Sequence, residues 1–132
     1  MTEAVVSNGQ VLAYVVRGTP EPENTEFHTP DEVELQAGFI VHSAGSVIAP
    51  HKHAQVSRII DRHCEVIVVR KGCCEVDIFD EENNLVATHT LRVGDLAILV
   101  GGGHGFRMLE DTILLEVKQG PYHGPQEKVL LP

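Results

Sequence analysis

The amino-acid sequence predicts an all-β domain, and three observations support this. Short runs rich in Val, Ile, Leu or Phe recur at residues 11–16, 37–42, 46–49, 65–70, 75–79, 85–91, 95–100, 105–109 and 112–118. Turn-forming residues such as Gly, Pro, Asn, Asp and Ser stand between these runs. No long pattern with a helical period is present. Many short strands separated by turns are typical of a β-sandwich or a β-barrel.

The elements can be placed in chain order from these runs and the residues between them. The run over 11–16 comes first, and a linker is expected over 18–25, where prolines and acidic residues interrupt the pattern. One short N-terminal helix is expected next, because Thr29 can cap a turn that has Pro30 at its first position and Asp31 and Glu32 after it. Turns are then predicted at residues 44–45, 71–72, 80–84, 93–95, 101–103 and 110–111.

The length of 132 residues suits a single domain. We divide it into an N-terminal arm with an early strand (1–34), a barrel core (35–120) and a C-terminal tail (121–132). A domain of this size can bury enough surface to fold without disulfides or a structural metal.

Charge and composition argue against several partners. The chain has 10 basic and 19 acidic residues, a net charge of −9 with neutral histidines, so it lacks the basic surface that nucleic acids require. Its apolar stretches are far shorter than the roughly 20 residues of a membrane-spanning helix. The first residues show no signal-peptide pattern, and the three cysteines cannot all pair. We therefore expect a cytoplasmic protein that contacts neither nucleic acid nor membrane.

Eight histidines are many for a chain of this size. On a strand, the spacing of His51 and His53 projects both imidazoles from one face, as two nitrogens on one metal ion require. Glu65 opens an apolar run, where a carboxylate either points to water or is held at a cavity mouth by a balancing charge. His104 follows three glycines and is either an ordinary turn residue or a ligand whose direction the glycines set.

These residues stand in a frame of glycines that resembles the first sequence motif of the cupin superfamily. That motif is a glycine, five residues, His-x-His, a short gap, a glutamate, six residues and a second glycine. The matching positions here are Gly45, His51, His53, Glu65 and Gly72. The gap before the glutamate is eleven residues, longer than in the family, so His63, which shares the strand face of Glu65, is an alternative ligand.

The second cupin motif is a glycine, a turn with proline and glycine, and a histidine, which Gly94, Gly102 and His104 resemble. Val100 takes the place of the proline, and Met108 stands where an asparagine often closes the motif.

The resemblance implies a cupin-type double-stranded β-helix, which is a jelly-roll barrel. It extends to small single-domain cupins of bacteria and archaea that carry stretches similar to residues 102–106 and 116–122, a group to which no reaction is assigned.

The resemblance also implies one divalent metal ion, bound by His51, His53, Glu65 and His104, with His63 as the alternative ligand. Imidazoles and a carboxylate suit Fe(II), Mn(II), Ni(II), Co(II) or Zn(II) and leave coordination positions open. A metal with an open position can polarise a carbonyl or hydroxyl group, or lower the pKa of bound water.

Residues of the inserted segment are candidates for the rim of the pocket. Gln55, Arg58 and Arg62 lie in this segment, and the two arginines can bind a carboxylate or phosphate group or pair with acids at the surface.

Residues of the last two predicted strands are further pocket candidates. Phe106 and Met108 share the strand face of His104, where they either line the cavity or pack in the core. Glu116 and Lys118 share a face as well, either as an acid–base couple or as solvated charges at a strand edge.

Three functions are compatible with these residues. The first is a metal-dependent enzyme acting on a small polar molecule, such as a carbohydrate or an organic acid, and the second is a non-catalytic cupin that binds or senses a ligand. The third is a metal-free sugar-nucleotide isomerase or epimerase, for which Tyr14 and Tyr122 are the only available tyrosines. By analogy with cupins, we expect a homodimer that pairs through the strand at 11–16.

Overall fold

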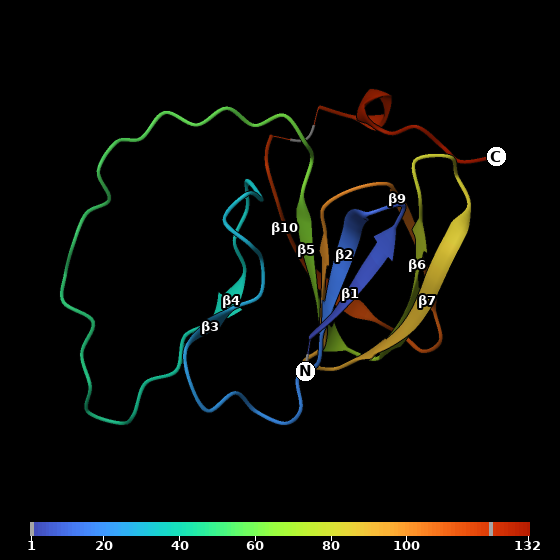
Figure 1. Cartoon of the computed structure of the whole chain (residues 1–132). Coiled ribbons are helices and arrows are strands. Elements are labelled where there is room, and N and C mark those ends of the chain that lie inside the picture. Colours follow the sequence, from blue (N-terminus) through green and yellow to red (C-terminus); the bar gives the residue numbers. More distant parts are fainter. Residues whose placement is uncertain (1, 122) are drawn as a thin grey trace.

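The computed structural model describes residues 2–121 and 123–132, and within them the protein is all-β (Figure 1). The strands are β1 (Thr2–Ser7), β2 (Gln10–Val16), β3 (Glu26–Phe27), β4 (Gly38–Phe39), β5 (Glu65–Lys71), β6 (Cys73–Phe79), β7 (Leu85–Arg92), β8 (Leu96–Leu99), β9 (Gly103–Met108) and β10 (Ile113–Lys118). A single 3-10 turn, Pro125–Glu127, follows them. None of the described helical segments is long and apolar enough to cross a bilayer.

The described strands form three antiparallel sheets and no closed barrel. The large sheet has the strand order β1-β2-β8-β5-β10, and the small sheet has the order β7-β6-β9. A two-stranded ribbon of β3 and β4 stands beside them. At one side of the sandwich β1 lies against β7, so that the other side is bounded by the edge strands β10 and β9.

The core lies between the large and small sheets. Ile67 and Val69 of β5 pack there with Val76 and Ile78 of β6, and all four side chains are buried. Because side chains alternate along a strand, Glu65 shares the face of Ile67 and points between the sheets.

The outer face of the large sheet carries a second apolar cluster. Val66 and Ile98 pack there with Val33, Phe39 and Cys64, which come from the chain outside the sheet. The large sheet is therefore covered on both faces, as expected for the uninterrupted apolar run of β5. The three cysteines, all within the described residues, are free and buried.

The first strand was not among the predicted ones. Asn8 and Gly9 join β1 to β2 with φ values of 51° and 75°, the left-handed backbone that a two-residue hairpin turn requires. β2 pairs with β1 on one side and with β8 on the other. It has no free edge, so the expected pairing of residues 11–16 with a neighbour's sheet is wrong.

The expected N-terminal helix is also absent from the described residues. The Val33 amide donates to the Pro30 carbonyl at 3.2 Å, but the turn does not continue into a helix. The Thr29 hydroxyl accepts a hydrogen bond from the Ala37 amide instead of capping the turn. That contact draws the chain toward the β3–β4 ribbon.

The predicted strand at 46–49 does not form, and the one at 37–42 shrinks to the two residues of β4. Residues 40–63, which we call the projecting segment, contain no strand, and Figure 1 shows this part of the chain curving away from the sheets. Strand conformation requires a hydrogen-bonded neighbour, and a single chain supplies none here.

Candidate functional site

Three titratable side chains meet at the opening between the sheets. Glu65 begins β5, and its side chain is only 11% exposed. His104 Nε2 lies 3.1 Å from Glu65 Oε2, and His63 Nε2 lies 2.9 Å from Glu65 Oε1. Each carboxylate oxygen therefore faces one imidazole. We call these three residues the interior cluster.

The small sheet brings His104 to the cluster. The preceding Gly102 has a φ of 61°, and a Cβ there would lie 2.1 Å from the Phe79 carbonyl oxygen, so only glycine allows this approach. His104 then pairs with Ile78 across β6. Since Glu65 belongs to the large sheet, its contact with His104 bridges the two sheets.

The carboxyl group of Glu65 is held in its ionised form. The hydrogen bond from His104 is the main cause that lowers its pKa from 4.5 to about 2, and the hydrogen bond from His63 adds to it. Burial acts in the opposite direction but is outweighed. The interior cluster thus fixes a negative charge between the sheets.

Two more charged residues share the interior face. Lys118 pairs with Glu65 across β10 and β5, and Glu116 pairs with Ile67. Lys118 Nζ lies 3.6 Å from Glu116 Oε1, and the Glu116 side chain lies near enough to Glu65 to influence its pKa. The shared face inferred from the spacing of Glu116 and Lys118 therefore lies next to the interior cluster.

The aromatic candidate lies next to His104. The Phe106 ring packs against the main core and meets the His104 ring edge-on, with 6.0 Å between centroids. Met108 lies farther along β9 and is half-exposed.

His51 and His53 are not brought to the interior cluster. Both are exposed in the projecting segment, with their rings 5.2 Å apart, and His51 Nδ1 lies 2.7 Å from the Ala49 carbonyl oxygen. Across the described residues, no group of three or more His, Cys, Asp or Glu is placed to hold a metal ion. In the interior cluster itself, the imidazoles point at the carboxylate oxygens of Glu65 rather than at a common centre.

The other candidates of the projecting segment lie among acids. Arg62 Nε lies 2.9 Å from Glu34 Oε2, and Arg58 lines a groove of about 660 Å³ together with Asp31 and Glu32. Gln55 is exposed. The structure thus places these side chains apart from Glu65.

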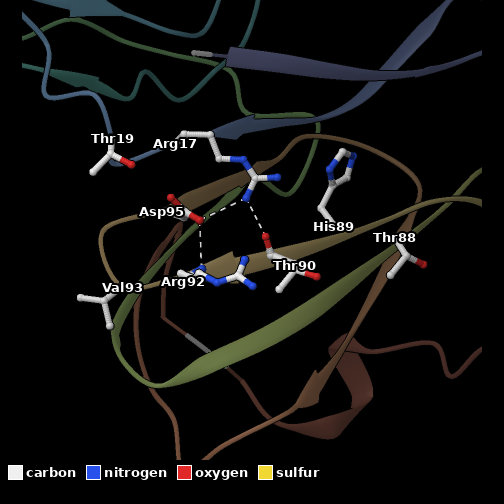
Figure 2. A pocket seen from close by; sticks show the side chains of 8 residues that line it. All are labelled: Arg17, Thr19, Thr88, His89, Thr90, Arg92, Val93 and Asp95. Atoms are coloured by element: carbon white, nitrogen blue, oxygen red, sulfur yellow. Dashed lines mark hydrogen bonds and ion pairs between the residues drawn. The ribbon is translucent and has the colours of Figure 1, made fainter.

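A second polar groove, of about 630 Å³, lies where β2 ends beside the β7–β8 turn (Figure 2). Asp95 accepts hydrogen bonds there from the amides of Gly18 and Arg92, both at 2.9 Å, and from the Arg17 guanidinium at 3.1 Å. Sequence reasoning did not find the Arg17–Asp95 pair, because the two residues are 78 positions apart and no motif links them. The hydrogen bonds of Asp95 hold the β7–β8 turn to the end of β2, which is a structural role.

Of the two tyrosines considered for a metal-free isomerase, the one that the structure describes does not lie in the interior cluster. Tyr14 packs on the outer face of the large sheet, on the side opposite to Glu65. Tyr122 lies outside the described residues.

Comparisons with known proteins identify a family but no activity. No curated protein and no solved structure matches this chain. One family model, described as a domain of unknown function (DUF6016), matches residues 21–91. The matched region is more than half of the chain; it includes the projecting segment and Glu65 and ends before His104. The chain therefore belongs to the DUF6016 family.

Proposed function

We propose that this protein is a cupin-type jelly roll that binds one divalent metal ion at the interior cluster and acts on a small polar molecule. The observation that carries the proposal is the buried, ionised carboxylate of Glu65 on the large sheet, which is contacted by His104 of the small sheet and by His63 just before β5. Burying a charged group costs free energy unless an opposite charge balances it. A divalent metal ion is an opposite charge that a set of imidazoles and a carboxylate suits.

The chemistry of the donors fits a metal ion. Metal ligands must be deprotonated, and Glu65 is already ionised because its pKa is about 2. His63 and His104 place an imidazole nitrogen beside each oxygen of that carboxylate, and a bound metal ion would replace these two hydrogen bonds. His51 and His53, whose rings are neighbours, would complete a mixed nitrogen and oxygen set of the kind that Fe, Mn, Ni, Co and Zn accept.

The open side of the sandwich supports the jelly-roll assignment. β10 and β9 are edge strands of the two sheets, and Glu65 on β5 and His104 on β9 lie beside this opening. Two further strands from the projecting segment would cover both edges and close the barrel.

The chain's own residues indicate a polar substrate. Lys118 and Glu116 lie on the same interior face as Glu65 and can bind hydroxyl or carboxylate groups and transfer protons. Phe106 provides an apolar wall beside His104. The bound metal would supply Lewis acidity toward an oxygen of the substrate.

Metal analysis of purified protein tests this proposal. Wild-type protein loaded with Mn(II), Fe(II), Ni(II), Co(II) or Zn(II) should hold about one ion per chain and release it below about pH 6, as the imidazoles protonate. The variants Glu65→Gln and His104→Ala should lose it. His123→Ala, which removes an exposed histidine of the tail, is the matched control and should keep the metal. Full metal content in His104→Ala, or none in loaded wild type, would overturn the proposal.

A further inference from the structure

The projecting segment exposes more apolar surface than a segment in water should retain. Val47 and Ile59 are 81% and 83% exposed. More than half of each of four other side chains is exposed as well, and these are Ile40, Ile48, Val56 and Ile60. Removing such side chains from water stabilises a protein, so a surface that covers this segment is strongly favoured.

The projecting segment also differs in charge from the rest of the molecule. It contains Lys52, Arg58 and Arg62 against the single acid Asp61, a net charge of +2. Because the whole chain carries −9, the remaining residues carry −11. Arg62 pairs with Glu34 of its own chain. The remaining basic residues, Lys52 and Arg58, are electrostatically complementary to the acidic body of another copy.

The open side of the sandwich offers a matching surface. β10 is the edge of the large sheet, and Ile113, Leu115 and Val117 on it are half-exposed. β9 is the facing edge of the small sheet and carries the half-exposed Met108. Unpaired edges with apolar side chains are ready to accept another strand.

The two ends of the projecting segment determine where it can go. Phe39 precedes it and Cys64 follows it, and both pack on the outer face of the large sheet. The interior cluster lies on the other face, and Figure 1 shows the segment curving away from its own sheets. His63, the last residue of the segment, already contacts its own Glu65, but to bring His51 and His53 there the segment would have to turn back around the β10 edge.

We propose that two copies of this chain exchange their projecting segments, each lying along the β10 and β9 edges of the other. The segment has 24 residues, which is the size that one partner contributes to a standard interface of about 20–30 residues a side. The exchange is isologous, so it closes into a dimer with two-fold symmetry. Resting on the metal centre proposed above, it brings His51 and His53 to Glu65 of the partner subunit.

Molar mass measured by light scattering tests the exchange without reference to metal. Wild type should be a dimer, and Val47→Asp with Ile59→Asp should be a monomer whose circular dichroism still shows folded sheets. The matched control is Val129→Asp with Leu130→Asp, which adds the same charges at side chains 88% and 90% exposed in the tail and should stay dimeric. A monomeric wild type, with the segment free or folded back, overturns the exchange. A dimeric Val47→Asp with Ile59→Asp variant overturns it as well.

Mixing two inactive variants tests the shared site. Neither His51→Ala with His53→Ala nor Glu65→Gln with His104→Ala should bind metal alone. After the two are unfolded and refolded together, half of the dimers should be mixed and have one complete site, so about a quarter of the wild-type metal content returns. A dimeric wild type that binds metal without this recovery overturns the exchange. A segment-dependent dimer that binds no metal overturns the metal centre and leaves the exchange standing.

Discussion

Asp95 joins the β7–β8 turn to the end of β2, and Asp95→Ala should lower the free energy of unfolding by about 4 kcal/mol. The carboxylate is buried and accepts three hydrogen bonds, from the amides of Gly18 and Arg92 and from the Arg17 guanidinium (Figure 2). The substitution removes all three at once.

The magnitude follows from what each donor loses. An unpaired buried donor costs about 1–3 kcal/mol. The Gly18 backbone packs tightly against Gly94, since a Cβ at Gly18 would lie 2.6 Å from the Gly94 backbone, so the Gly18 amide has little freedom to turn to another acceptor. Arg17 loses less, since it is partly exposed and keeps its 2.6 Å hydrogen bond to the Thr90 carbonyl. Two amides at near full cost and one guanidinium at a discount give about 4 kcal/mol.

Urea unfolding followed by circular dichroism measures the change. The free energy of unfolding of Asp95→Asn should lie between those of wild type and Asp95→Ala. The amide oxygen of Asn can keep some of the hydrogen bonds, but its amino group would face a donor and cannot accept from it. Glu23→Gln removes one negative charge at an exposed loop residue and is the matched control. An Asp95→Ala protein within about 0.5 kcal/mol of wild type would refute this account of the turn.

Two further predictions concern pH and backbone geometry. In metal-free protein, wild type should exceed Glu65→Gln in stability by up to about 3 kcal/mol above pH 4.5, and the difference should disappear as the pH falls from 4.5 toward the folded-state pKa of about 2. Urea titrations between pH 6 and 2 measure it, and a difference independent of pH contradicts the prediction. Gly72→Ala should destabilise by at least about 1 kcal/mol more than Gly9→Ala in the same assay. Both positions have positive φ, but only at Gly72 would a Cβ meet a backbone atom, the Asp111 oxygen at 2.3 Å, so equal losses would be evidence against this steric cause.

Most strands with partners inside the chain could be predicted from sequence. β5 was expected at 65–70 and is found at Glu65–Lys71, because its apolar run is buried on both faces. Residues 2–7 were missed, although Asn8-Gly9 is the strongest short hairpin signal and could have revealed them. The run at 46–49 has strand composition but no neighbour in a single chain, and composition cannot supply a neighbour.

The sequence predicted some residues of the candidate site and not others, depending on whether strand pairing positions them. Glu65 and His104 meet because β5 and β9 each pair within their own sheet and the two sheets pack together, and His63 joins them because it lies two residues before Glu65. His51 and His53 depend on where the projecting segment docks, which their spacing does not specify. The contact of Arg62 with Glu34 is a tertiary one that no local pattern indicates.

The arrangement of Cys64 and Glu65 has a practical consequence. They are adjacent residues on opposite faces of the large sheet, with the thiol in the outer apolar cluster and the carboxylate in the interior cluster. Cys64 is fully buried, and burial raises the pKa of its thiol, so alkylating reagents react with it only when the outer layer opens. Cys64 is the residue directly before Glu65. The rate at which its thiol is modified therefore measures how rigidly the scaffold holds the Glu65 carboxylate.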